Sequence, residues 1–372
     1  PAGTLAKSLD VITLSVTADN FIQKPTITIA GNSVGVTISP ANDGASFYTA
    51  TYTMQPDDAT AAEIAFTVDF LDLAGNEGDQ VTDLIGDADG GVSFDKQKPS
   101  FTIISIGSLD NDVSAATAED DHTRAYSGNE ITVSLTSDEI LKTGSNPTVT
   151  IADNNSIVVR TGTVGVTNTF TAKYTMSDVT DGDFHGQPIT INISNYFDPA
   201  GNQGDVKLAT TDGSEVVFDM QNPVLNTVTI ESDNTFSNWA AQDDIITVTI
   251  ISDENLQTSP GLTILSANPA FVMGINEKNW TVEKVVEGGH TQGEVGFNIT
   301  FEDVAGNQAG DINILIPDHW KNVTIDRVAP TITKADIRSD NSNGFHLAVP
   351  LNTIRLIVET NENIQQPTIS IA

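Results

Sequence analysis

Asp198-Pro-Ala-Gly-Asn202 is the stretch that decides the fold, because the chain repeats it. Asp72-Leu-Ala-Gly-Asn76 comes before it and Asp303-Val-Ala-Gly-Asn307 comes after it, so all three fit Asp-x-Ala-Gly-Asn. A second motif follows each of them a short way along the chain: Phe94-Asp95-Lys-Gln-Lys-Pro99, Phe218-Asp219-Met-Gln-Asn-Pro223 and Ile325-Asp326-Arg-Val-Ala-Pro330. A fixed pair of motifs that returns at the length of a small domain predicts tandem repeats and not one large fold.

Strand patterns fill the sequence between these motifs. Ile131, Val133 and Leu135 alternate with Thr and Ser, which is the period of a half-buried antiparallel strand. A strand that begins with Pro also recurs: Pro25-Thr-Ile-Thr-Ile29, Pro147-Thr-Val-Thr-Ile151, Pro260-Gly-Leu-Thr-Ile264 and Pro367-Thr-Ile-Ser-Ile371. About seven short strands in each hundred residues are typical of an immunoglobulin-like sandwich. We therefore predict an all-β fold of tandem immunoglobulin-like antiparallel β-sandwiches in an extended array.

The Asp-x-x-x-Pro motif sets the predicted domain boundaries, because it closes one copy and opens the next. The expected domains are 1–98, which lacks its first strand, 99–222, 223–329, and a partial domain 330–372 with the first three strands. An array cut at arbitrary points would have such ends. A polymer that donates strands between neighbouring subunits would have them too.

The composition excludes several classes of function. The 372 residues contain 50 Asp and Glu but only 16 Lys and Arg, giving a net charge of −34. Nucleic acid and anionic membrane surfaces are therefore not expected partners. Cysteine is absent, which excludes disulfides, thiol catalysis and thiolate metal sites. No apolar run is long enough to span a bilayer.

Together, the recurring motifs resemble the bacterial Ig-like repeats of giant calcium-dependent surface adhesins. The resemblance implies a non-catalytic stalk on a cell surface or extracellular appendage, often stiffened by Ca²⁺ at the domain junctions. The expected partners are neighbouring repeats of the same protein, with a surface glycan or host ligand bound outside this stretch of sequence. No Ser-His-Asp constellation has supporting spacing, so we expect no enzyme.

Topology converts the resemblance into a candidate metal site. In an Ig-like sandwich, the acidic loop Ser137-Asp138-Glu139 and the Asp-x-Ala-Gly-Asn loop share one pole. Several carboxylates that converge without Lys or Arg favour Ca²⁺, which takes about 6–8 oxygen ligands. The predicted ligands at the first junction are Asp95, Asp138, Glu139, Asp198 and Asn202. Those at the second are Asp219, Asp253, Glu254, Asp303 and Asn307, with Asp110 or Asp112; Asp326 is the linker aspartate of the third.

Other interpretations of the same residues remain open at this point. Asp, Asn and Gly are the usual turn residues, so Ala-Gly-Asn can be a tight turn with Gly at positive φ and no ion. The chain can also be the subunit of a filament or surface layer, assembled by strand complementation between like subunits. A third reading is a glycan-binding module of a secreted enzyme, because Trp239, Trp280 and Trp320 all lie in the third copy.

Overall fold

The computed structural model describes residues 4–86, 90–109, 123–161, 168–256, 259–274, 276–316 and 322–371. Grouping by contacts divides the chain into two units: residues 1–221 with 305–307, and residues 222–304 with 308–372. Three hydrophobic cores draw on residues 6–94, 101–218 and 225–325, and we call the parts around them the first, second and third sandwich. The division into domains at the predicted boundaries stays a proposal.

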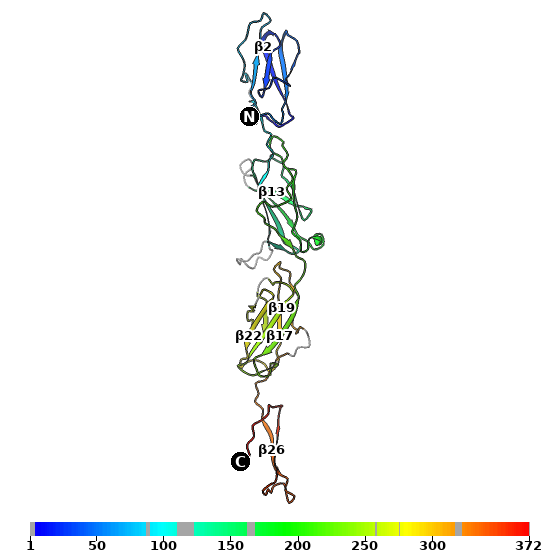
Figure 1. Ribbon diagram of the computed structural model, residues 1–372, viewed down its shortest axis with the longest axis vertical. Coiled ribbons are helices and arrows are strands. Elements are labelled where there is room, and N and C mark those ends of the chain that lie inside the picture. The colour runs from blue at the N-terminus through cyan, green and yellow to red at the C-terminus, as the bar shows by residue number, and fades with distance from the viewer. Residues whose placement is uncertain are drawn as a thin grey trace. The chain divides into compact units, whose positions relative to one another are not determined.

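The second sandwich, which carries the label β13 in Figure 1, has the strand order of an immunoglobulin domain. One sheet runs β13-β14-β10-β8 and a second runs β12-β11-β15, while the short strand β9 pairs in parallel with the last strand, β16. Its elements are β8 (Phe101–Leu109), β9 (Arg124–Ala125), β10 (Glu130–Ser137), β11 (Thr148–Ile151), β12 (Asn154–Asn155), β13 (Ile157–Thr161), β14 (Thr169–Thr175), the 3-10 segment η1 (Gly182–Phe184), β15 (Ile191–Ser194) and β16 (Val217–Phe218). The first sheet corresponds to the four-stranded sheet of the immunoglobulin fold.

The predicted alternation along β10 is what builds this core. Ile131, Val133 and Leu135 are all buried, and their partners on β14 are Tyr174, Ala172 and Phe170. The polar residues between them stay on the other face of the sheet. Each buried apolar side chain of this size contributes roughly 1.5–3 kcal/mol relative to an exposed one, so the alternation fixes the register of the pair.

The third sandwich, in the second unit, repeats this topology. Its sheets are β17-β19-β22-β21, β20-β24 and β18-β25-β23, with β18 parallel to β25. The strands are β17 (Leu225–Ser232), β18 (Trp239–Ala240), β19 (Ile245–Ser252), β20 (Gly261–Ile264), β21 (Val272–Met273), β22 (Asn279–Val285), β23 (Gly293–Glu294), β24 (Phe297–Thr300) and β25 (Thr324–Ile325). The repetition confirms the prediction of tandem Ig-like β-sandwiches.

The first sandwich contains β1 (Thr4–Ala6), β2 (Val11–Ile22), β3 (Thr26–Ile29), β4 (Thr37–Ser39), β5 (Ala45–Thr53), β6 (Phe66–Asp69) and β7 (Val92–Phe94). Its sheets are β2-β5-β4 and β3-β6, and β1 pairs in parallel with β7. Within the described residues, β2 is therefore an edge strand, whereas β10 and β19 each pair with a further strand, β8 and β17.

The fourth copy contains one antiparallel pair, β26 (Ile332–Ser339) and β27 (Ile354–Thr360). The prediction of a third strand at Pro367–Ile371 is wrong, because the described residues after Thr360 form no strand. In the three sandwiches, the equivalent strand pairs with β6, β15 or β24. No such partner is present in the described part of the fourth copy, so the ladder hydrogen bonds that define a strand cannot form.

Candidate metal centre

The Asp-x-Ala-Gly-Asn motif forms a closed turn through its own hydrogen bonds. Asp198 Oδ1 accepts the backbone N–H of Asn202 at 2.8 Å, and Asp198 Oδ2 accepts the Asn202 side-chain amide at 2.7 Å. Gly201 donates to the Asp198 carbonyl at 3.1 Å and has φ = 91°, a conformation that favours glycine. Asp198, Gly201 and Asn202 therefore each contribute to the turn, as the turn interpretation predicted.

The linker aspartate Asp95 follows β7 and is held by three hydrogen bonds. Its N–H donates to the Ala6 carbonyl at 2.9 Å, and its Oδ1 accepts the N–H of Gln97 at 2.9 Å. Its carbonyl accepts the side-chain amide of Asn202 at 2.9 Å. Asn202, predicted as a ligand, thus uses its amide nitrogen to join the linker to the turn.

The two acidic residues after β10, Asp138 and Glu139, make different contacts. Asp138 Oδ1 accepts the N–H of Ser100 at 2.8 Å, and Asp138 N–H donates to the Ser100 carbonyl at 2.9 Å, which ties this loop to the start of β8. In the fourth copy, Asn361 makes the same pair of bonds to Thr331. Since a neutral amide serves equally well there, this position needs an acceptor oxygen and not a charge.

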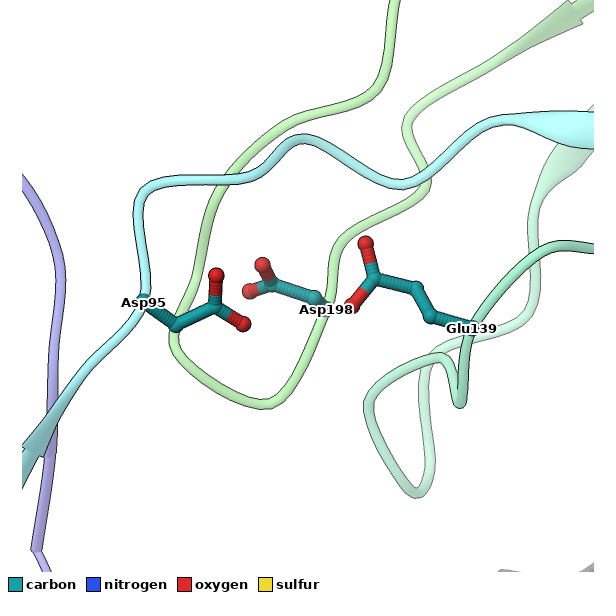
Figure 2. Close-up of side chains that lie close together, drawn as sticks. All are labelled: Asp95, Glu139 and Asp198. Atoms are coloured by element: carbon teal, nitrogen blue, oxygen red, sulfur yellow. The ribbon is translucent and has the colours of Figure 1, made fainter. Parts of the chain in front are cut away.

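Glu139 points instead towards Asp95 and Asp198 (Figure 2). One carboxylate oxygen from each of these three residues lies within 4.8 Å of the other two. Asp198 is completely buried and the other two side chains are half-buried. In the part of the chain that the structure describes, no ion pair involves any of the three.

The electrostatics of this acidic triad, Asp95, Glu139 and Asp198, are unfavourable without a cation. Burial raises the pKa of Glu139 to about 7, and the charges of Asp198, Asp95 and Asp138 add to that effect. Glu139 Oε1 is shielded from solvent and has no hydrogen-bond partner. A buried acceptor without a donor costs stability, so this oxygen is placed for a proton or a metal ion.

The second unit holds part of an equivalent group. Carboxylate oxygens of Glu254 and Asp303 lie within 4.8 Å of each other, and Asp303 is buried. Asp253 Oδ1 accepts the N–H of Val224 at 2.8 Å, the counterpart of the Asp138–Ser100 bond. Asp219 belongs to the first unit, where its Oδ1 accepts the N–H of Gln221 at 3.0 Å. A second metal site that includes Asp219 stays a prediction.

The remaining candidate ligands separate into three cases. Asn307 groups with the first unit, and its side-chain amide donates to the Asp219 carbonyl at 3.1 Å. Asp326 repeats the turn of Asp95, because its Oδ1 accepts the N–H of Val328 at 3.0 Å. Asp110 and Asp112 lie outside the described residues.

A buried polar network escaped the sequence interpretation. Asp181 is completely buried and accepts the Tyr174 hydroxyl at 3.0 Å, the Asn154 amide at 2.8 Å and the Ser177 N–H at 2.8 Å. Asp58 has the corresponding bonds to Tyr52, Asn32 and Gln55 in the first sandwich. The available signal in the sequence is Tyr-Thr-Met, which occurs as Tyr52-Thr-Met54 and Tyr174-Thr-Met176, since a buried tyrosine needs a partner for its hydroxyl.

The tryptophans of the third sandwich do not form one group in the described residues. Trp280 is buried and its indole N–H donates to the Glu277 carbonyl at 2.8 Å, whereas Trp239 is 45% exposed. Trp320 lies outside the described residues.

Comparison with known proteins finds only distant structural likenesses. No family model and no curated protein matches the sequence. A tetra-tandem repeat from the extending region of a large adhesion protein is 14% identical over 96% of this chain and 87% of its own, with a TM-score of 0.27. The D1–D4 ectodomain fragment of ICAM-5 is 12% identical over 85% and 74%, with a TM-score of 0.28. The SGBP-B protein of the Bacteroides ovatus mixed-linkage glucan utilisation locus, in complex with a heptasaccharide, is 13% identical over 92% and 71%, with a TM-score of 0.15.

In the part of the chain that the structure describes, no helix has the length and apolar character needed to cross a bilayer.

Proposed function

We propose that this chain is a non-catalytic stalk of tandem Ig-like repeats, belonging to an adhesive protein on a cell surface or extracellular appendage. Ca²⁺ binds at the junctions between repeats and stiffens them. The observation that carries the proposal is the acidic triad, because it joins a linker residue, Asp95, to two loops of the next sandwich. An ion held by all three would link the two sandwiches through the linker itself.

The chemistry of the donors supports calcium. All three side chains offer hard carboxylate oxygens, which suit Ca²⁺, whereas structural zinc sites use Cys and His. Backbone carbonyls and water would complete the coordination. Asp95, Glu139 and Asp198 are the residues that would hold the ion, and its charge would replace the repulsion among them by attraction.

Thermal unfolding of the whole chain in Ca²⁺, Mg²⁺ and EDTA tests this proposal. At a free Ca²⁺ concentration one hundred times the dissociation constant, binding to the folded state adds about 2.7 kcal/mol to its stability. We expect a clear rise in the melting temperature that Mg²⁺ does not reproduce. Superimposable melts would remove calcium from the proposal.

Glu139→Gln is the sharpest variant, because Glu139 contributes to the triad but holds no turn together. It should abolish the calcium shift of the second sandwich and raise its melting temperature in EDTA, since one repelling charge is gone. Asp72→Asn is the matched control, because Asp72 lies in the same motif without a triad. That variant should keep the full calcium shift.

One observation favours the alternative of a filament subunit. β2 is an edge strand in the described structure, so it exposes backbone groups that can pair with a strand of another subunit. Sedimentation of the whole chain over a range of concentrations separates the two functions. Concentration-dependent growth into polymers supports the filament, and a monomer at all concentrations supports the stalk.

A further inference from the structure

The residue that directly follows each linker aspartate reaches back to the sandwich that the chain has just left. Lys96 follows Asp95, and its Nζ donates to the carbonyls of Pro56 at 2.9 Å and Asp58 at 2.6 Å. Asp58 is itself fixed by the buried network with Tyr52 and Asn32. Lys96 therefore binds two main-chain oxygens of the first sandwich, and it makes no ion pair with a carboxylate in the described part of the chain.

The third linker repeats this contact with a different cation. Arg327 follows Asp326, and its guanidinium donates to the carbonyls of Gly288 and His290. The two contacts occupy the same position in the fold. Met54 hydrogen-bonds the turn before β2, and Val286 hydrogen-bonds the turn before β19. In both cases the accepting carbonyls lie two and four residues after that residue. Two linkers with different sequences thus make the same contact to main-chain oxygens.

The second linker has no cation at this place. Met220 follows Asp219, and its N–H donates to His185 Nδ1 at 3.1 Å. Its sulfur packs close to Gly182, where an added Cβ would lie 3.8 Å from it. The loop here contains η1.

We infer that Lys96 and Arg327 are linker anchors: they fix the direction in which the chain leaves the first and third sandwiches, without any metal ion. A charged donor to a carbonyl makes a stronger bond than a neutral donor, and two such bonds restrain a side chain more than one. In the first linker the bonds Asp95 N–H to Ala6 and Gln97 N–H to Asp95 act on the same short segment. The second linker, with Met220, has a packing contact in place of the cation.

Residue Lys98 provides the comparison within the same linker. Its Nζ pairs with Asp205 at 2.8 Å, but both side chains are well exposed, at 60% and 74%. Exposed ion pairs are screened by salt and restrain little. The two lysines thus differ in the contact they make while sharing charge, length and neighbourhood.

Pulsed electron–electron resonance between two nitroxides tests the anchor. The chain has no Cys, so labels can be placed at Val34→Cys in the first sandwich and Ile157→Cys in the second, both strongly exposed. All samples contain EDTA, so the result does not depend on the calcium proposal. Thermal melts of each variant show whether the sandwiches stay folded.

We expect a narrow distance distribution for the unchanged chain and a wider one for Lys96→Met. Lys96→Arg should keep it narrow, because a guanidinium can reach the same two carbonyls, as Arg327 does. Lys98→Met should also leave it narrow. A wide distance distribution in the unchanged chain would overturn the inference. So would a Lys96→Met variant with unchanged melts whose distribution is no wider than that of the unchanged chain.

Discussion

The turn Asp72–Asn76 and the turn Asp198–Asn202 have the same sequence pattern and the same hydrogen bonds. Asp72 Oδ1 accepts the Asn76 N–H at 2.8 Å and Oδ2 accepts its side-chain amide at 2.6 Å, as Asp198 does with Asn202. Yet Asp72 is half-exposed and Asp198 completely buried. The motif therefore explains the turn in both sandwiches, but it does not by itself explain the acidic triad at Asp198.

The neighbouring strands explain the difference. In the second sandwich β10 ends at Ser137, so the chain turns and brings Glu139 to Asp198. In the first sandwich β2 continues to Ile22, and Asp19 is exposed within the strand. A candidate metal centre thus needs the turn, a strand that ends early and a linker aspartate.

Removing the aspartate from each turn should produce the largest difference in stability between the two sandwiches. In Ca²⁺, Asp198→Ala removes two acceptor oxygens from the half-buried Asn202 as well as one ligand, so the second sandwich should lose about 3 kcal/mol or more. Asp72→Ala should have a much smaller effect on the first sandwich, because water replaces the lost acceptor. Calorimetry that resolves the unfolding transitions of the full chain measures both. Equal losses would show that the turn alone accounts for the role of Asp198.

The pH dependence of stability should have opposite signs for Glu139 in the second sandwich and Asp72 in the first. The raised pKa of Glu139 means that in EDTA the folded state holds a proton that the unfolded state releases, so stability falls as pH rises from about 4.5 to about 7. The Asn76 side-chain amide lowers the pKa of Asp72, so its contribution is present at neutral pH and is lost on acidification below the usual range. Melts in EDTA between pH 3 and pH 8, with Glu139→Gln and Asp72→Asn, separate the two.

The apparent affinity for Ca²⁺ should depend on pH through the same carboxyl group, that of Glu139. The ion must displace the proton of Glu139, so the apparent affinity should fall about tenfold for each pH unit below 7. Isothermal titration with Ca²⁺ at several pH values measures this slope. A binding constant that is independent of pH between 5 and 7 would exclude Glu139 from the set of ligands.

The smallest effect concerns Asp138, the neighbour of Glu139. Asp138→Asn should change neither stability nor calcium binding, because Asn361 makes the same bonds in the fourth copy. Asp138→Ala should cost about 1 kcal/mol, the value of the lost bond to Ser100. Urea unfolding of both variants provides the measurement. A loss of calcium binding in Asp138→Asn would place Asp138 among the ligands and erase the distinction from Glu139.

The strands and their inward faces could be predicted because they depend on local alternation. Between Ile193 and Asp198 the second copy has one residue more than the other copies have at the same place. The structure places Asn195 there with φ = 54°, so that Tyr196 is buried in spite of the extra residue. A single slip in a period-two pattern is visible in the sequence itself.

The sequence could not predict which acidic residue of each loop binds the main chain and which one joins the other carboxylates. Asp138 and Glu139 are adjacent acids, and only the position of Ser100 decides that one of them binds the main chain. Asn202 resembles a ligand in the sequence but uses its amide nitrogen as a donor. Asp181 resembles an isolated acidic turn, yet Tyr174 and Asn154 from other strands enclose it. Contacts between distant segments settle each case, and turn residues look alike whatever they contact.

In each sandwich an early short strand pairs in parallel with the last strand, and this pairing has a mechanical consequence. β1 pairs with β7 in the first sandwich, β9 with β16 in the second and β18 with β25 in the third. A pull on the two ends of the chain would slide such strands past one another, which loads their hydrogen bonds together instead of opening them one by one. Each sandwich would then resist tension in shear, and its folded length would be kept until several bonds failed at once.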